Sequence, residues 1–510
     1  MNARVLVAVV AALAWGTASA QPRPVPPPPR VVAVPAAPAF QHAALTGNPA
    51  AAQHVWQAVA AHFDSLPDVA RRHLNEAIRL QPDMVIAHVL QSELAKKPED
   101  KKQHLDAATS FAKTQKLLPW EKVWLQIAQL HYAGKPALAL KQNEALVKAN
   151  PNEPWFYVAR GSAYLFLDTP PTTEKARIDY EKAVTLWPGC RAGWNMLGYT
   201  LIRQNKLQDA LNALTRYVQL SPNLANPHDS LAEVLLRAKR LKEAEGEYKT
   251  ALRLDPGFHD SRIGLGYTLV NIGLSLRGPN AGAHITQGLQ ELELAFAKST
   301  EPHLKAMALR MMTVCHLLLQ KPGQAAATLE RYEQWARQHN DPEAVAAAQM
   351  FSAMVHAILG VYRHAYVKAD EAAVSVQDPR VSPATKQRVL VQRAVTKALV
   401  LLELGEPAAA EAKLKEFAKA AAAAEWIKQT LGDLKGTGFV FRGDAKKAIA
   451  LLAHANEDQP MALYYLGRAQ LKAGDPGARG TLERLAASTV LNCHSGLWRF
   501  AAVETLRTMK

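Results

Sequence analysis

Apolar residues between positions 191 and 222 recur at the spacing of an α-helix, in two runs that a short polar stretch separates. The first run places Trp194, Leu197, Gly198 and Leu201 on one helical face, and the second places Ala210, Leu214 and Tyr217 on another. Residues spaced i, i+3, i+4 and i+7 lie on the same side of a helix, so each run presents one face for burial. The pattern predicts two amphipathic helices joined by a turn at Asn205-Lys206.

The same pattern occurs in the blocks on either side. The next block has His228, Leu231, Ala232 and Leu235 and then Ala244, Tyr248 and Ala251, and the preceding block has Tyr157, Gly161 and Tyr164 and then Ala176, Tyr180 and Ala183. Pro188, Pro222 and Pro256 stand 34 residues apart, and Pro82, Pro119 and Pro151 extend the series at spacings of 32 to 37. Because proline lacks an N–H donor and clashes with the preceding turn, we expect each of these prolines to end a helix.

The block from residue 191 to 222 resembles the tetratricopeptide-repeat family, whose pattern is W-x2-L-G-x2-Y, then A-x3-F, then P. Trp194, Leu197, Gly198, Ala210 and Pro222 match it in position. The resemblance implies an all-α, TPR-like α-solenoid of stacked helical hairpins, because one hairpin cannot bury its apolar face alone. The stretch 226–233 also resembles a segment common in bacterial members of the family.

These patterns divide the chain into five segments. Residues 1–20 are a signal peptide, 21–44 a Pro-rich linker, 45–275 the TPR solenoid, 276–300 a Gly-containing connection with a helix, and 301–510 a degenerate TPR-like αα-repeat region. In the last segment we expect hairpins over 390–424, turned at Gly405-Glu406-Pro407, and over 461–487, with Gly467 at the small-residue position. Glycines predict a loop at 277–282, as a border between two halves, and a second break at Gly436-Thr437-Gly438.

The resemblance places a partner-binding groove on the concave side of the solenoid, which the first helix of each hairpin lines. The positions that we expect to be exposed there are Asn195, Tyr199, Arg203, Asn226, Asp229, Glu233, Arg237, Tyr267 and Asn271. This mixture of aromatic, amide and charged groups suits an extended peptide; an ordinary solvated face is the alternative. Some family members clamp a C-terminal carboxylate with Lys and Asn, but the corresponding positions include Trp155, Ala192 and Asn226, which do not support that clamp.

Residues 1–20 have the features of a secretory signal. Arg4 precedes an apolar run from Val5 to Trp15, and Ala18-Ser19-Ala20 is a cleavage site. No cysteine follows this site, which argues against a lipoprotein anchor, and we expect no transmembrane segment in the mature chain. The signal favours a bacterial periplasm, with secretion as the alternative. The eight prolines of residues 21–40 predict an extended spacer, with a ligand for a proline-reading groove as the alternative.

The formal net charge of the chain is +15. Lysines and arginines are spread along the chain without a run of five, which favours a basic solvated surface over an anionic partner. No nucleic-acid module is recognisable, so we expect no specific nucleic-acid partner.

Catalytic and ligand-binding motifs are not found in the sequence. There is no phosphate-binding loop, no HExxH and no GxSxG, and Gly264-Leu265-Gly266 is interpreted as a packing feature. The three cysteines lack the CxxC spacing of zinc sites. Cys315-His316 and Cys493-His494 are neighbours in sequence, but neighbouring side chains on a helix point about 100° apart, so these pairs do not make a metal site. We expect no catalytic residue, no metal and no cofactor.

Together these observations predict a non-enzymatic protein–protein interaction scaffold in the bacterial cell envelope, with an unidentified protein or peptide as its partner. An accessory factor in envelope or exopolysaccharide assembly is one alternative. An enzyme with an unrecognised site in the C-terminal half is the other.

Overall fold

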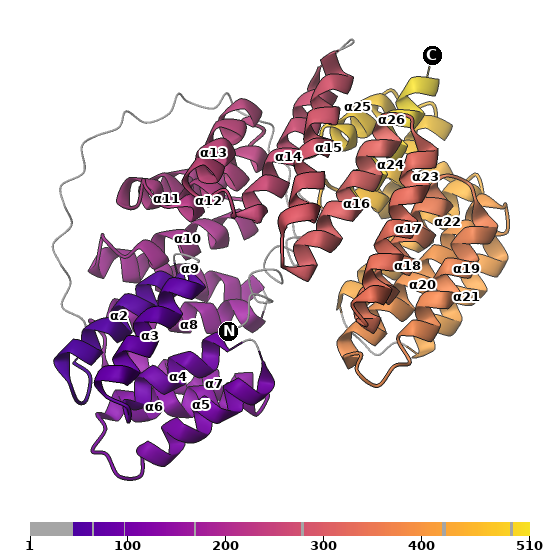
Figure 1. The fold of residues 1–510 in the computed structure, drawn as a ribbon. Helices are drawn as coiled ribbons and strands as arrows, with labels where there is room; N and C mark the ends of the chain where they lie inside the picture. The colour runs from indigo at the N-terminus through magenta and orange to yellow at the C-terminus, as the bar shows by residue number, and fades with distance from the viewer. Residues whose placement is uncertain are drawn as a thin grey trace. The chain divides into compact units, whose positions relative to one another are not determined.

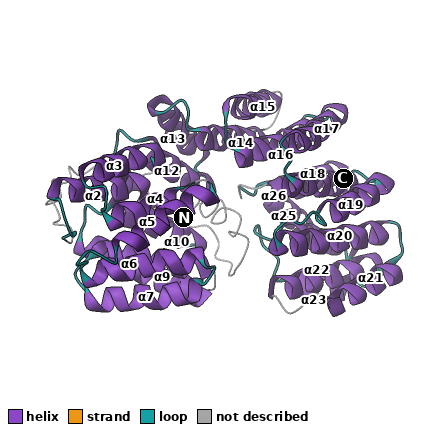
Figure 2. Cartoon of the chain, turned by 60° about the horizontal axis from the view of Figure 1, so that its bottom comes forward, coloured by secondary structure: helices purple, strands orange, loops and turns teal. Residues whose placement is uncertain are grey.

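The computed structural model describes residues 44–63, 66–95, 97–167, 170–276, 280–420, 425–489 and 493–509. Over these residues all regular secondary structure is helical, as the fold-class prediction requires (Figure 2). The predicted signal peptide and nearly all of the Pro-rich linker lie outside the described residues. Of the predicted loop at 277–282, residues 277–279 also lie outside the described residues. Residues 280–282 begin α15 (Asn280–Lys298), so the prediction of a loop is wrong for them. Within the described part, no helix is long and apolar enough to cross a membrane.

The chain divides into two compact units, whose boundary lies at residues 239–255. The helices of unit 1 are α2 (Pro49–Phe63), α3 (Pro67–Leu80), α4 (Val85–Leu94), α5 (Pro98–Phe111), α6 (Pro119–Tyr132), α7 (Pro136–Ala149), α8 (Pro154–Leu167), α9 (Pro170–Leu186), α10 (Arg191–Arg203), α11 (Leu207–Leu220) and α12 (Ala225–Arg237) (Figure 1). Helix α13 (Leu241–Leu254) lies at the boundary. The predicted border at 277–282 therefore does not coincide with the division between these units.

Unit 2 begins with a hairpin and ends with a single helix. Its helices are α14 (His259–Ser275), α15 (Asn280–Lys298), α16 (Pro302–Leu318), α17 (Pro322–Gln338), α18 (Pro342–Ile358), α19 (Tyr362–Ser375), α20 (Pro383–Glu403), α21 (Pro407–Ala420), α22 (Glu425–Phe441), α23 (Ala445–Leu452), α24 (Pro460–Lys472), α25 (Gly477–Ala486) and α26 (Cys493–Thr508). In both units consecutive helices pack against each other, as a repeat of hairpins requires.

The first helices α4, α8, α10 and α12 share a side-chain hydrogen bond that the sequence pattern did not reveal. The fourth residue of the helix donates to the carbonyl oxygen of a proline six positions earlier, in the turn before the helix. The pairs are His88 Nε2 with Pro82 (2.9 Å), Tyr157 Oη with Pro151 (3.0 Å), Trp194 Nε1 with Pro188 (2.9 Å) and His228 Nε2 with Pro222 (3.0 Å). This bond fixes the turn that joins one hairpin to the next.

Small residues allow the two helices of a hairpin to approach closely, as predicted. A Cβ atom at Gly198 on α10 would lie 2.5 Å from Cγ of Leu214 on α11. The second helices supply large buried side chains to the same contacts, including Tyr180 and Tyr217. The hairpin turns also use the left-handed region that favours glycine and asparagine: Asn205 has a φ of 56° and Gly405 a φ of 80°, at the predicted turns.

Two predictions about helix ends are wrong. Pro119 begins α6 instead of ending a helix, because the first helical position needs no N–H donor. Gly436-Thr437-Gly438 lies inside α22 and is not a break. A Cβ atom at Gly436 would lie 2.8 Å from Cγ of Leu452, so this glycine serves the close approach of α22 and α23.

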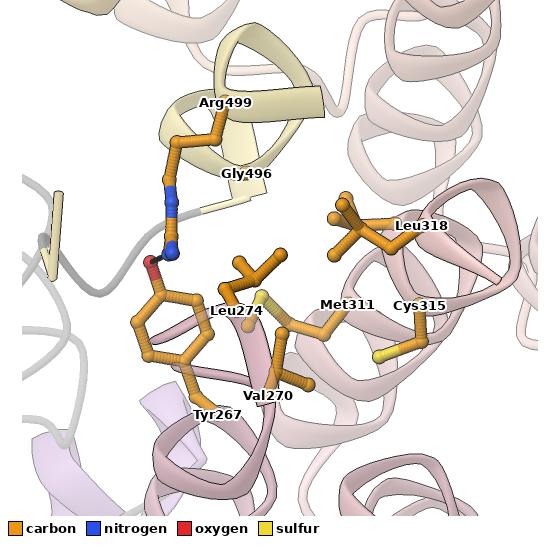
Figure 3. A pocket seen from close by; sticks show the side chains of 9 residues that line it. Tyr267, Val270, Leu274, Met311, Cys315, Leu318, Gly496 and Arg499 are labelled. Atoms are coloured by element: carbon orange, nitrogen blue, oxygen red, sulfur yellow. Dashed lines mark hydrogen bonds between the residues drawn. The ribbon is translucent and has the colours of Figure 1, made fainter. Parts of the chain in front are cut away.

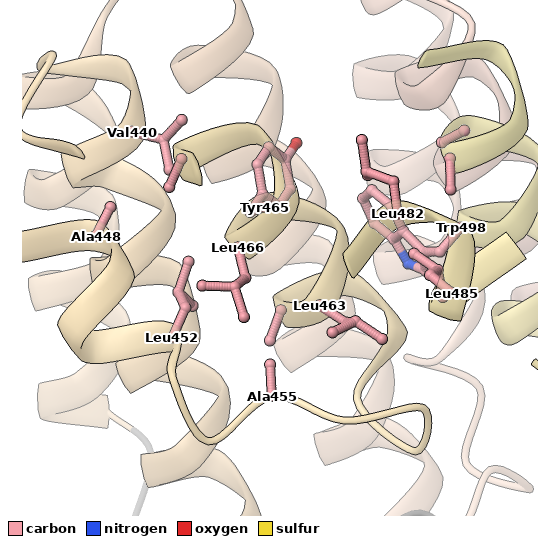
Figure 4. Close-up of a cluster of buried hydrophobic side chains, with 14 of the residues drawn as sticks. Val440, Ala448, Leu452, Ala455, Leu463, Tyr465, Leu466, Leu482, Leu485 and Trp498 are labelled. Carbon is pink, nitrogen blue, oxygen red and sulfur yellow. The ribbon is translucent and has the colours of Figure 1, made fainter. Parts of the chain in front are cut away.

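The predicted hairpins of the C-terminal region are present as α20 with α21 and as α24 with α25. Gly467 does occupy the small-residue position, since its Cβ would lie 2.7 Å from Cγ of Leu482 on the paired helix. The core here contains Leu452, Leu463, Leu466, Leu482, Leu485 and Trp498, which come from α23 to α26 (Figure 4).

Candidate partner-binding site

The nine predicted groove residues lie on three first helices in two different units. Asn195, Tyr199 and Arg203 are on α10, and Asn226, Asp229, Glu233 and Arg237 are on α12, all in unit 1. Tyr267 and Asn271 are on α14, in unit 2. The structure therefore brings seven of them together in one unit, and the other two belong to a separate compact body.

The expectation that these positions are exposed is wrong for four of them. Asn195, Asn226, Tyr267 and Asn271 are buried, with exposed fractions of 8%, 7%, 1% and 3%. The other five side chains are half-buried. Helical periodicity identifies the side of a first helix, but the packing of neighbouring helices decides how much of that side reaches solvent.

On α12, Asn226 is engaged in packing. Its Nδ2 donates to Oη of the buried Tyr217 on α11, at 3.0 Å. Because this amide satisfies a buried hydroxyl, Asn226 holds α11 and α12 together. We therefore remove Asn226 from the candidate surface.

On α10, Tyr199 connects the two first helices. Its hydroxyl donates to Glu233 Oε2 at 3.0 Å and lies 3.3 Å from Ser230 Oγ, both on α12. Burial, and then the negative charge of Glu233, raise the pKa of Tyr199 well above its usual range. The phenol is therefore neutral at physiological pH and acts as a donor to the carboxylate.

Asn195, one turn before Tyr199, has an unsatisfied acceptor. Its Oδ1 is buried and has no hydrogen-bond partner among the described residues. A buried carbonyl oxygen left without a donor costs about 1–3 kcal/mol. Because this oxygen is shielded from solvent, an N–H group of another molecule would remove this cost only if the Asn195 side chain turned towards the surface.

Tyr267 and Asn271 are engaged within unit 2. Tyr267 Oη accepts a hydrogen bond from Nη1 of Arg499 on α26, at 3.0 Å (Figure 3), and Asn271 Nδ2 donates to the carbonyl oxygen of Tyr267 at 2.8 Å. Arg499 also donates from Nε to the carbonyl of Ala486 at 3.1 Å. The adjoining cavity is about 10 Å³ in volume, room for at most one water molecule. These contacts position α26.

Helix α2 covers part of the first-helix side of unit 1, which the sequence pattern did not indicate. Trp56 on α2 is buried against Trp120 on α6 and Trp155 on α8, with ring centroids 6.3 and 6.4 Å away. Just before α2, the backbone N–H of Thr46 donates to Oε1 of the buried Glu121 at 2.8 Å. Helix α2 also contacts α10. The number of tryptophans in this half indicated aromatic packing, but helical periodicity does not show which tryptophans contact each other.

The structure also places the possible metal ligands and two of the cysteines. No group of three His, Cys, Asp or Glu side chains among them could hold a metal ion. Cys190 and Cys315 are both buried, and burial raises the pKa of Cys315 to about 12, so its thiol stays protonated. The side chain of Cys493 lies outside the described residues.

Comparison with known proteins supports the repeat assignment. The tetratricopeptide-repeat family model matches residues 173–225, which include α10 and α11 and the start of α12. These residues of the chain are therefore tetratricopeptide repeat. The search of curated proteins gave no match to its sequence.

Similar solved structures are also repeat proteins. MamA from Desulfovibrio magneticus RS-1 is 19% identical, with 34% of this chain and 96% of that chain covered and a TM-score of 0.30. PilF from Pseudomonas aeruginosa is 15% identical, with 42% and 91% covered and a TM-score of 0.34. A thermophilic TPR protein from Thermus thermophilus is 20% identical, with 43% and 99% covered and a TM-score of 0.28. At these values the similarities carry no argument about function.

Proposed function

We propose that this protein is a non-enzymatic interaction scaffold of the bacterial cell envelope, which binds a peptide or protein segment along α10 and α12. Tetratricopeptide repeats supply an extended surface for a protein partner. The observation that carries the location is the unsatisfied Oδ1 of Asn195 beside the Tyr199–Glu233 pair. We infer that the Asn195 side chain turns outward when an extended segment binds, so that a backbone N–H of the segment donates to Oδ1.

The remaining groups of this surface suit a polar segment without a strong net charge. The two negative charges of Asp229 and Glu233 balance in number the two positive charges of Arg203 and Arg237. All four side chains are half-buried on α10 and α12. Because α2 already covers the first helices around Trp120 and Trp155, the partner segment is limited to the α10–α12 side of unit 1. The predicted signal peptide supports a partner in the cell envelope.

The proposal is tested by in-cell cross-linking and mass spectrometry with the full-length protein in its host. Asn195→Ala removes the acceptor, and we expect it to reduce cross-links to the partner by about fivefold to tenfold, the value of roughly one hydrogen bond. Asn212→Ala, an exposed asparagine on α11, is the matched control and should leave the yield unchanged. Equal yields from wild type and Asn195→Ala, or no envelope protein at all, would count against the proposal.

A further inference from the structure

Unit 2 contains a second cavity, about 470 Å³ in volume, between the five helices α18, α19, α20, α24 and α26. Helix α18 contributes Ala357 and Ile358, α20 contributes Glu403, α24 contributes Arg468, and α26 contributes Trp498. This volume is in the range of pockets that hold small ligands or a partner's side chain. None of the nine predicted groove residues lines it.

One ion pair supplies the charges of the cavity. Arg468 Nη1 and the Tyr465 hydroxyl, the latter at 3.1 Å, both donate to the same carboxylate oxygen, Oε1 of Glu403. Among the described residues, Oε2 of Glu403 has no hydrogen-bond partner, and Nε and Nη2 of Arg468 have none either. About a quarter of each charged side chain is exposed, 23% for Glu403 and 24% for Arg468. The pair therefore presents one spare acceptor and spare donors to the cavity.

The walls around this pair are aromatic and aliphatic. Tyr464, Tyr465 and Trp498 contact one another with ring centroids 5.2 to 5.8 Å apart, and Tyr465 and Trp498 are seen on two separate elements in Figure 4. The hydroxyl of Tyr464 is occupied by Thr505 Oγ1 at 3.2 Å. Ile358 and Leu399 provide apolar surface beside the rings. The walls therefore favour a bulky apolar group.

The charged pair determines which polar group the ligand has beside its apolar part. The guanidinium would repel a free cation placed at Oε2, and the carboxylate would repel a free anion placed at Arg468, so each ion gains less attraction from the pair than from an isolated opposite charge. A neutral group that both donates and accepts satisfies Oε2 and an Arg468 N–H together. The amide of a peptide is such a group, since each unit has one N–H and one C=O.

We propose that this cavity binds a peptide segment of the partner by a bulky apolar side chain, with the adjoining amide hydrogen-bonded to Glu403 and Arg468. The inference rests on the proposed function in so far as the natural ligand is a protein. It assigns that protein a second anchoring site, in unit 2, and states the chemistry of the anchor.

Three small molecules with the same phenyl group test this chemistry on the full mature chain by ligand-observed NMR titration. N-acetyl-phenylalaninamide is a neutral diamide, phenylacetate is an anion and phenethylammonium is a cation. We expect the diamide to bind about tenfold more tightly than either ion. No binding of the diamide at millimolar concentration, or tighter binding of an ion, would overturn the proposal.

Two variants locate the binding and test the role of the charges. Ala357→Phe fills the cavity without removing a contact and should abolish binding of the diamide, whereas Ala373→Phe, at a half-buried alanine on α19, should leave it unchanged. Glu403→Gln leaves Arg468 without its counter-charge and should shift the preference from the diamide to phenylacetate. Circular dichroism on each variant confirms that the helices are retained. Unchanged binding of the diamide to Ala357→Phe would overturn the assignment of binding to this cavity.

These results are separable from the test of the proposed function. If Asn195→Ala loses the envelope partner but N-acetyl-phenylalaninamide does not bind, the scaffold stands and the second anchor fails. If the diamide binds in the predicted manner but no envelope protein is cross-linked, the cavity stands and the proposed function fails.

Discussion

At the scale of single residues, the fourth position of the first helices α4, α8, α10 and α12 is defined by a hydrogen-bond donor. Trp194, Tyr157, His88 and His228 differ in size and charge, yet all four donate to the proline carbonyl six residues earlier. The family pattern has tryptophan at this position. The variation along this chain follows from the shared donor group, because a Trp, Tyr or His ring extends far enough to reach that carbonyl and has an N–H or O–H at its edge.

Tyr157→Phe tests this donor with the smallest change, since it removes only the hydroxyl. We expect a loss of about 1 kcal/mol in the free energy of unfolding of unit 1, the net value of one hydrogen bond. The measurement is the urea midpoint followed by circular dichroism. Tyr132→Phe, at an exposed tyrosine of the same unit, is the control and should shift stability by less than about 0.5 kcal/mol. Equal effects of the two substitutions would show that the bond to Pro151 contributes nothing.

At the scale of elements, α22 shows why two glycines in one helix are not equivalent. A Cβ at Gly436 would meet Cγ of the buried Leu452 at 2.8 Å, whereas a Cβ at Gly438 would meet only Leu402 Cδ2 at 3.9 Å. Glycine inside a helix costs about 1 kcal/mol relative to alanine, so its presence needs a local reason. At Gly436 the local reason is the close approach of α23, and Gly438 has no such reason.

The same pair provides a prediction with opposite signs. Gly438→Ala should stabilise the protein by about 0.5–1 kcal/mol, because alanine restricts the unfolded chain and fits the space. Gly436→Ala should destabilise it by about 1–3 kcal/mol, because a buried leucine has to move. Thermal unfolding of both variants beside wild type decides this. Stabilisation by Gly436→Ala would show that α22 and α23 are not in close contact.

At the scale of the whole molecule, unit 1 contains half-buried histidines that make its stability depend on pH. His88 Nε2 donates to Pro82, so its Nδ1 is an acceptor, and Nδ1 of His104 on α5 donates to it at 3.2 Å. Burial, and then the nearby His88, lower the pKa of His104 below its usual 6.5. Burial also lowers the pKa of His73, which lies against His54.

A histidine with a lowered pKa in the folded state makes stability fall in acid. Below pH 6.5 the unfolded chain takes up a proton that the folded chain resists, so the contribution is complete above pH 6.5 and is lost as the pH falls towards the folded pKa. We expect the urea midpoint to be lower at pH 5.5 than at pH 7.5. His104→Gln keeps a donor for His88 without titrating, and should reduce this difference. An unchanged difference would exclude His104 as a contributor.

Export is also a property of the whole molecule, and it is tested by the mature N-terminus. Cleavage after Ala20 predicts a protein that starts at Gln21 and is found in the periplasmic fraction. N-terminal sequencing of the protein purified from that fraction checks both statements. A chain that retains Met1, or that stays with the cytoplasmic fraction, would contradict the predicted signal peptide.

Sequence periodicity predicted the local structure well because the information is local. The residues 194, 197, 198 and 201 form one helical face, and Gly198 meets Leu214 because the hairpin brings back the next helix at a fixed distance. Pro119 and Gly436 were misassigned for a related reason. Proline can start a helix or end one, and glycine can break a helix or allow it to pack closely against another. Only the neighbouring helix distinguishes the two outcomes in each case.

What the sequence by itself determined was the hairpin, its repeat and the side of each first helix that faces inward, because these depend on spacings within about 34 residues. Only the tertiary structure decided how accessible that side is. Trp56 contacts Trp120 and Trp155, which lie 64 and 99 positions further along the chain. Arg499 contacts Tyr267 across 232 positions, and Arg468 contacts Glu403 across 65 positions. Such contacts result from how successive hairpins stack, and no short-range pattern encodes them.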